Sequence, residues 1–218
     1  MGLTKLGTMG SISGKVGKVV GSKWKGIPYL RAIPDNVKNP QTPAQLEQRM
    51  RFKLVTDLMY SMAPLLADGF KDGAGKTPVN RAVSFNIGRI ITGEYPDLEI
   101  DYSRLKISRG KLTEIYDAKV DGDVYRKAVF TWEDNSGYGD AKADDRILLL
   151  LINTDRDAPV YITEGFTRQD AEAEIDLPAS FAGQAFEAFI SVVRADGSKT
   201  ADSLYLGSFT AAEEPQEP

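Results

Sequence analysis

The spacing of the apolar residues changes once along this chain of 218 residues, close to Leu98. Before that point apolar residues recur at every fourth position, as in Leu46, Met50, Leu54, Leu58 and Met62. After it they alternate with polar residues, as in Leu98, Ile100 and Tyr102. The first spacing is typical of amphipathic helices and the second of strands with one buried face. The pattern therefore predicts an α+β, mostly β protein whose helices lie in its first half.

Two helices are expected before the change of spacing. The first begins at Thr42, with Pro43 after it and Gln45 as a capping-box partner, and runs to about Ala63 before Pro64. The second begins at the similar Thr77-Pro78 pair. Its apolar stripe consists of Val79, Val83, Phe85, Ile87, Ile90 and Ile91. We expect the two helices to pack against each other as an antiparallel pair.

The first 33 residues are rich in glycine and are expected to form a hairpin of two short strands, residues 15–21 and 22–33. Glycine inside a strand often marks a bulge or a close approach of two backbones. The segment before Ser13 is expected to be an arm that becomes ordered against a partner. A linker, residues 34–41, leads to the first helix.

Beyond Gly110 the chain is predicted to consist of strands and turns. The expected strands are residues 115–120, 125–132, 146–153, 160–163, 171–177, 185–194 and 203–210. Strands at such spacing predict an antiparallel β-sandwich of immunoglobulin or fibronectin type III kind. Trp132 ends an alternating set with Ala128 and Phe130 and is expected in its core.

Charge is distributed unevenly between the two halves of the chain. Residues 1–110 hold 17 Lys and Arg against 9 Asp and Glu, whereas residues 111–218 hold 10 against 22, which gives net charges of +8 and −12. This asymmetry favours two units with different surfaces. The predicted domains are a basic arm, hairpin and helical unit at 1–110, an acidic sandwich at 111–210 and a disordered acidic tail at 211–218.

Histidine and cysteine are both absent from the chain. Their absence excludes Ser–His and Cys–His catalysis, the usual zinc sites and disulfides. Chemistry based on carboxylates, Ser–Lys pairs or magnesium stays open, but no motif points to it. We therefore expect a protein that is not an enzyme and that carries no cofactor or metal.

Two short motifs resemble ligand sites but favour ordinary turns. The sequence from Gly73 to Thr77 resembles part of a phosphate-binding loop, but Phe70 stands where that loop needs glycine and an amphipathic helix precedes it. Thr77 is better placed as a helix cap. The acidic residues between Asp134 and Asp145 lack the spacing of a calcium-binding loop.

Basic residues of the N-terminal half are interleaved with aromatic ones. The candidate contact residues are Lys15, Lys18, Lys23, Trp24, Lys25, Tyr29, Arg31, Arg49, Arg51 and Lys53. Such residues contact a phosphate backbone or single-stranded nucleic acid, and they serve equally well against an acidic protein surface. The alternative is an ordinary solvated surface around a small core that buries Trp24.

Several segments together resemble one family. They are SGKVGKVVG at 13–21 with WKG at 24–26, NPQTPAQ at 39–45 with Gln48 and Arg49, residues 80–86, and TGEYP at 92–96. The chain resembles an uncharacterised Bacteroidota family (Bacteroides and Flavobacterium type) of unknown function, firmly over 1–110 and loosely over the sandwich. The resemblance implies no catalytic residues, and it implies an association with phages and mobile elements.

These observations lead to two hypotheses. The first is a non-enzymatic structural or assembly protein, a component of a phage-like virion or mobile-element particle, that self-associates or joins a larger assembly through residues 1–110. The second is a nucleic-acid-binding accessory protein that uses the basic half. No apolar run reaches the roughly 18 residues of a membrane span and residues 1–21 show no signal peptide, so the expected location is the cytoplasm, or the virion if the protein is phage-encoded.

Overall fold

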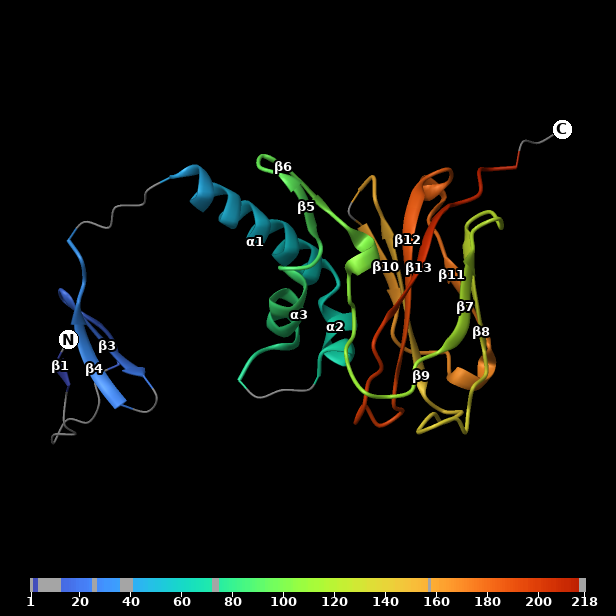
Figure 1. Ribbon diagram of the computed structural model, residues 1–218, viewed down its shortest axis with the longest axis horizontal. Helices are drawn as coiled ribbons and strands as arrows, with labels where there is room; N and C mark the ends of the chain where they lie inside the picture. The colour runs from blue at the N-terminus through green and yellow to red at the C-terminus, as the bar shows by residue number, and fades with distance from the viewer. Residues whose placement is uncertain are drawn as a thin grey trace. The chain divides into compact units, whose positions relative to one another are not determined.

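The computed structural model describes residues 2–3, 13–24, 27–35, 41–71, 75–156 and 158–215, without the side chains of residues 2, 3 and 24. The chain forms two compact units, Met1–Thr42 and Pro43–Pro218. They are described separately below, and Figure 1 gives the labels of their helices and strands.

The first unit is a small antiparallel sheet. Its strands are β1 (Gly2–Leu3), β2 (Gly14–Val16), β3 (Val19–Trp24) and β4 (Ile27–Ala32), in the order β1-β4-β3-β2. The predicted strand 15–21 is therefore wrong, because a turn at Gly17 and Lys18 divides it into β2 and β3. Gly17 has a φ of +58°, a left-handed conformation that glycine adopts without a steric penalty.

The second unit begins with a layer of helices. They are α1 (Pro43–Ser61), α2 (Ala63–Gly69) and α3 (Pro78–Asn86), and the hairpin of β5 (Ile91–Glu94) and β6 (Asp97–Ile100) follows. Both predicted helix starts are confirmed, but α3 ends at Asn86 because Ile91 already belongs to β5. Helix α2 was not predicted. Pro64, which we took as a stop, lies in its first turn, where a missing N–H leaves no hydrogen bond unmade.

The rest of the second unit is a β-sandwich. Its strands are β7 (Tyr116–Asp121), β8 (Lys127–Glu133), β9 (Arg146–Asn153), β10 (Ala158–Ile162), β11 (Glu172–Asp176), β12 (Ala185–Val193) and β13 (Leu204–Thr210). The antiparallel sheets have the orders β11-β8-β7 and β10-β9-β12-β13. With the strands lettered A, B, C, C′, E, F and G, these orders are E-B-A and C′-C-F-G, an immunoglobulin-type arrangement. The predicted sandwich is thus confirmed, and Trp132 lies in its core.

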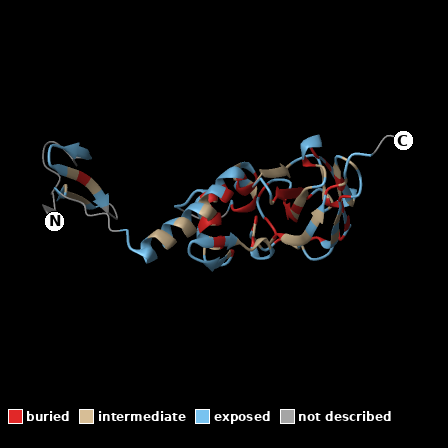
Figure 2. Ribbon diagram, turned by 90° about the horizontal axis from the view of Figure 1, so that it is seen from above, coloured by how far each residue is buried: buried red, intermediate tan, exposed pale blue. Residues whose placement is uncertain are grey.

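The sheet β10-β9-β12-β13 is covered on both faces (Figure 1). On β9, Ile147, Leu149 and Leu151 point into the sandwich core, whereas Leu148, Leu150 and Ile152 belong to the core under the helices. On strand β12, Phe186 points into the sandwich core and Phe189 belongs to the core under the helices. The buried residues consequently run through the whole second unit, as Figure 2 shows.

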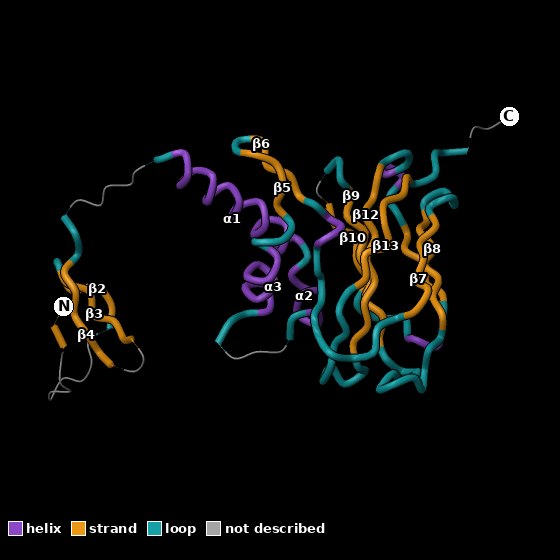
Figure 3. Tube along the Cα trace, in the orientation of Figure 1, coloured by secondary structure: helices purple, strands orange, loops and turns teal. Residues whose placement is uncertain are grey.

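The predicted boundary at residue 110 therefore falls inside a compact unit. The helices bury their apolar stripes on the outer face of the four-stranded sheet, so they share a core with the strands (Figure 3). The predicted tail also begins later than residue 211. Ala211 is buried, and its N–H and that of Ala212 donate to the carbonyl oxygens of Gln184 and Gly122.

Candidate interaction surfaces

The first unit places several predicted contact residues on one face of its sheet. Lys15 lies opposite Val20, and Val20 lies opposite Arg31. Directly opposite residues of antiparallel strands share a face, so Lys15 and Arg31 flank Val20 on the same side. Tyr29, two residues before Arg31, is on this face as well. The sheet thus brings two cations and an aromatic ring together.

The other predicted residues of this unit are spread around it. Lys23 pairs with Pro28 and lies on the opposite face. Lys18 is in the turn, and its Nζ is 3.3 Å from Asp35 Oδ1 in an ion pair exposed to solvent. Trp24 pairs with Ile27 in register, but its side chain and all of Lys25 lie outside the described residues.

This small sheet has almost no core of its own. Among the described residues of the first unit, Gly21 alone is buried. Val16 and Ile27 are 62% and 51% exposed. A sheet gains its stability by burying an apolar face, and among the described side chains of this one Val16 and Ile27 stay largely open to solvent.

Arg49, Arg51 and Lys53 belong to the second unit, on the first half of α1. Arg51 Nη2 is 2.8 Å from Glu47 Oε1, one turn away on the same helix. Lys53 is exposed. The ten predicted contact residues are therefore divided between two units.

An apolar groove runs between α1 and α3. Phe52, Thr56 and Tyr60 recur every fourth residue and form one wall. The opposite side is formed by Lys76, Asn80, Val83, Ser84 and Ile87. The groove has a volume of about 530 Å³, and Phe52 and Tyr60 are more than half exposed at 53% and 59%. Sequence reasoning missed this surface because it assigned Val83 and Ile87 to the apolar stripe of the second helix and gave Phe52 and Tyr60 no role.

A basic pocket lies beside Phe85 and shares Lys76 and Ser84 with this groove. It has a volume of about 330 Å³, and its lining residues are Phe70, Lys76, Arg81, Ser84, Phe85, Arg89 and Arg109. The guanidinium carbons of Arg89 and Arg109 lie 4.0 Å and 4.7 Å from the centre of the Phe85 ring. At these distances a cation is attracted to the negative face of an aromatic ring. None of these residues was among the predicted contacts.

Arg81 shapes the wall of this pocket. It donates to the carbonyl oxygens of Phe70, Lys71 and Lys76 over distances of 2.7, 2.6 and 2.6 Å. These bonds attach both ends of the connection between α2 and α3 to the helix. The spacing of Arg81, Phe85 and Arg89 at four-residue intervals was the sequence signal for this face, because such residues lie on one side of a helix.

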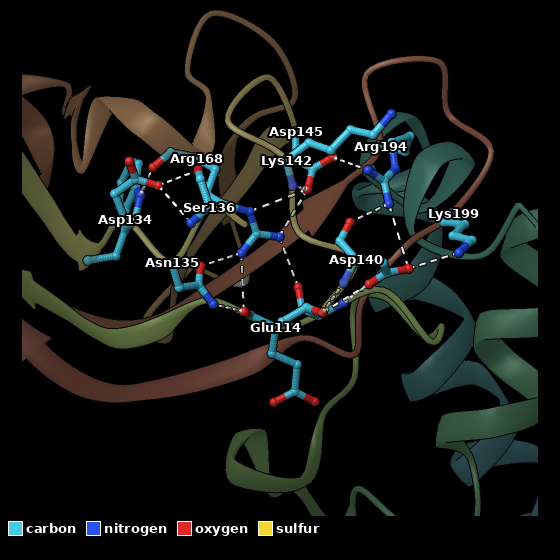
Figure 4. Close-up of polar contacts among 12 residues, drawn as sticks. Glu114, Asp134, Asn135, Ser136, Asp140, Lys142, Asp145, Arg168, Arg194 and Lys199 are labelled. Atoms are coloured by element: carbon cyan, nitrogen blue, oxygen red, sulfur yellow. Dashed lines mark hydrogen bonds and ion pairs between the residues drawn. The ribbon is translucent and has the colours of Figure 1, made fainter. Parts of the chain in front are cut away.

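A charged cluster lies at one end of the sandwich and is largely buried (Figure 4). The Arg168 guanidinium donates to Asp145 Oδ2, Asn135 Oδ1 and the carbonyl oxygens of Thr113 and Glu114, at distances of 2.5 to 3.3 Å. Arg168 and Asp145 are fully buried. Because the acceptors of this arginine come from two segments, residues 113–114 and the 134–145 loop, the cluster fixes that loop to the sandwich.

Two further cations complete this cluster. Arg194 Nη1 lies 3.3 Å from Asp145 Oδ1, and Lys199 Nζ lies 2.8 Å from Asp140 Oδ2. Lys199, together with the amide and hydroxyl of Thr113, holds the pKa of Asp140 far below its usual range. Arg194 Nη1 and Asp145 Oδ1 meet in their ion pair without a hydrogen bond, and the mutual pairing of these charges gives the cluster the character of a structural anchor.

The motifs that resembled ligand sites are ordinary caps and turns in the structure. Thr77 Oγ1 accepts from the N–H of Asn80 at 3.2 Å and caps α3, as expected. Helix α2, and no strand, precedes the Gly-Lys-Thr sequence. Within the described residues, no group of three or more carboxylates is arranged to hold a metal ion. In the same part of the chain no helix is long and apolar enough to cross a membrane.

These features define a class of protein, an immunoglobulin-type sandwich with a helical layer on its four-stranded sheet and a small separate sheet before it. The chain belongs to the family of unknown function DUF6266, whose family model matches residues 11–207. The uncharacterised family expected from the sequence is thereby confirmed, while its Bacteroidota origin stays an expectation. No curated protein matches the chain in sequence.

Solved structures similar to the chain include isolated sandwich domains. The fibronectin type III domain of the human collagen α-1(XX) chain is 9% identical, with 49% of this chain and 90% of that domain covered and a TM-score of 0.37. That of human contactin 1 is 11% identical, with 51% and 88% covered and a TM-score of 0.34. A computationally redesigned β-sandwich protein is 16% identical, with 50% and 98% covered and a TM-score of 0.33. The fold assignment here rests on the strand order.

Proposed function

We propose that the protein is a non-enzymatic structural or assembly protein whose first unit binds a protein surface. The observation that carries this proposal is the uncovered sheet β1-β4-β3-β2, with Val16 and Ile27 more than half exposed. A four-stranded sheet with so little buried surface gains stability when a partner covers it. A component of a phage-like particle is the form of assembly that the family resemblance implies.

The charge of the sheet supports an acidic partner. Lys15 and Arg31 flank Val20 on one face, where they complement carboxylates. Residues 111–218 of a second copy carry a net charge of −12 and offer such a surface. Head-to-tail self-association of this kind is steered by charge and weakens with salt.

Light scattering on the purified full chain over a range of concentrations tests this proposal. We expect the chain to associate at low salt, and the Ile27→Asp variant to associate less because it places a negative charge in a contact with an acidic partner. Tyr95→Asp is the matched control, since Tyr95 is an exposed side chain outside both the first unit and residues 111–218, at 38%. A monomer at every concentration, alone and when co-expressed with the products of adjacent genes, contradicts the proposal.

Nucleic-acid binding by the first unit is the second candidate function. The observation in its favour is the common face of Lys15, Tyr29 and Arg31, which combines cations with a ring on which a base stacks. The test is the affinity of the full chain for single-stranded and duplex DNA and for RNA across a salt series. Absence of binding at about 50 mM salt, where phosphate contacts are strong, excludes it.

A further inference from the structure

We propose that the basic pocket beside Phe85 is a binding site for a phosphate group carried by a nucleotide or a nucleic-acid strand. The pocket lies on the second unit, among α2, α3 and the segment that holds Arg109. It shares no residue with the basic face of the first unit. The site therefore stands independently of the assembly role proposed above.

Three of the four cations that line this pocket lack a carboxylate partner in the described part of the chain. Lys76, Arg89 and Arg109 form no ion pair with any carboxylate there, and Lys76 Nζ has only the neutral Ser84 Oγ, 3.4 Å away. Arg51, by contrast, is paired with Glu47 on its own helix. Three cations around one cavity without counter-charges attract an anion.

The two arginines are already held in place. Arg89 and Arg109 lie against Phe85, and Arg89 Nη1 also donates to the carbonyl oxygen of Phe85. The backbone N–H of Arg109 donates to Gly69 O at 2.9 Å, which fixes this residue beside the end of α2. Side chains that are ordered before binding lose less entropy when a ligand arrives.

The donors fit a phosphate better than a carboxylate. A guanidinium presents parallel N–H groups that bind two oxygens of a phosphate or carboxylate. The two guanidiniums and the ammonium offer more donors and more positive charge than one carboxylate, with two oxygens and a single charge, can use. A phosphate monoester matches them better, because it carries up to about two charges and three acceptor oxygens. The volume of about 330 Å³ lies at the small end of the range for ligand sites.

A second cavity shares Arg109 with the first, and Lys111 adds a cation without an ion pair in the described part of the chain, whereas Lys199 is paired with Asp140. This cavity has a volume of about 600 Å³, and its lining residues are Arg109, Gly110, Lys111, Lys199, Thr200 and Asp202. Asp202 Oδ1 is occupied by the N–H of Gly110, at 2.9 Å. A strand with successive phosphates can therefore contact both cavities, and we expect an oligonucleotide to bind more tightly than a mononucleotide.

Binding is measured on the full chain at about 50 mM salt, where phosphate contacts are strong. The probes are a fluorescein-labelled oligothymidylate, followed by anisotropy, and AMP, followed by calorimetry. The variants are Arg89→Ala, Arg109→Ala and Arg109→Lys. The controls are Lys119→Ala and Arg126→Ala, two exposed cations of the sandwich, and Lys15→Ala is measured beside them to separate this pocket from the basic face of the first unit. Thermal melts of the variants check that each is folded.

We expect Arg89→Ala and Arg109→Ala each to weaken binding of the oligonucleotide about tenfold or more, as the loss of charged hydrogen bonds predicts. Arg109→Lys keeps the charge but loses the two parallel N–H donors of the guanidinium, so its affinity is expected to lie between those of Arg109→Ala and wild type. Each alanine variant should also reduce the slope of log affinity against log salt by about one unit. The controls should change affinity less than about twofold.

Three results overturn the proposal. The first is no binding of either probe at about 50 mM salt. The second is binding that Arg89→Ala and Arg109→Ala leave unchanged, or that Lys15→Ala weakens as much. The third is tighter binding of a polyglutamate peptide than of the oligonucleotide at the same pocket, which assigns it to an acidic protein segment. Binding of AMP without a gain for the oligonucleotide supports a nucleotide as the source of the phosphate.

Discussion

The shared sheet of the second unit predicts that its helical layer and its sandwich unfold together. Leu149 and Leu150 are neighbours on β9, both fully buried, and they point to opposite sides of the sheet. Leu149→Ala removes contacts from the sandwich core, and Leu150→Ala removes contacts from the core under the helices. The pair therefore perturbs each core separately with the same chemical change.

The expected cost is similar for the two substitutions. A fully buried leucine replaced by alanine destabilises a protein by about 2–5 kcal/mol, because apolar contacts are lost and a cavity remains. Against a typical total stability of about 5–15 kcal/mol, this is a large fraction. With a urea dependence of about 1–3 kcal/mol per molar, each midpoint should fall by about 1 M or more.

Two probes follow the two layers in one urea titration. The chain has two tryptophans, so a Trp24→Phe background leaves Trp132 as the fluorescence probe of the sandwich. Circular dichroism at about 222 nm follows mainly the helices. We expect the two transitions to coincide in the parent and in both variants. If Leu150→Ala lowers the midpoint by circular dichroism and leaves the Trp132 transition in place, the layers unfold independently and the reasoning is wrong.

Three further predictions concern the same unit. Residues 111–218 expressed alone should aggregate or stay unfolded, because five apolar side chains lose the helices that cover them and each exposure costs about 1.5–3 kcal/mol of stability. Sedimentation and thermal melts measure this, and a stable monomer would contradict the shared core. Arg168→Ala should lower the free energy of unfolding by about 3–5 kcal/mol in urea titrations, since it leaves Asp145 and its neighbours short of donors; a smaller loss than for an exposed arginine would refute its anchoring role. The lowered pKa of Asp140 stabilises the folded protein above the unfolded pKa of about 3.9, and this stability is lost as the pH falls below it toward the folded pKa. Between about pH 5 and pH 2 the wild type should therefore lose more stability than Asp140→Asn, and equal losses would show that the carboxylate contributes nothing.

The strands of the sandwich were predictable from sequence because most of them have one buried face. Ala128, Phe130 and Trp132 alternate with polar residues on β8, and the structure buries all three. The continuous apolar run from Ile147 to Ile152 predicted the position of β9, and its lack of alternation also contained information about the surroundings of that strand. A run without alternation indicates a strand buried on both faces. Reading it so would have placed the helices on the sheet and removed the boundary at residue 110.

The basic pocket was harder to predict, for a physical reason. Arg81 and Phe85 lie on α3 and Arg89 follows three residues after its end, and their spacing of four residues is visible in the sequence. Arg109 reaches the same place only because the chain turns through β5 and β6 and then binds back to Gly69. Such a contact depends on the tertiary fold, which no local pattern encodes. The cations that sequence reasoning did select are numerous but lie on two separate units.

A strand with one solvated face leaves every second position free to vary during evolution, but β9 and β12 have no such positions over most of their length. A polar substitution along either strand would bury a polar group without a hydrogen-bond partner in one of the two cores. Sequence divergence among members of the family should therefore concentrate in β7, whose residues are half-buried or exposed, and in the outward positions of β8 and β11. The most conserved segment of the sandwich would then be its central pair of strands, for reasons of packing alone.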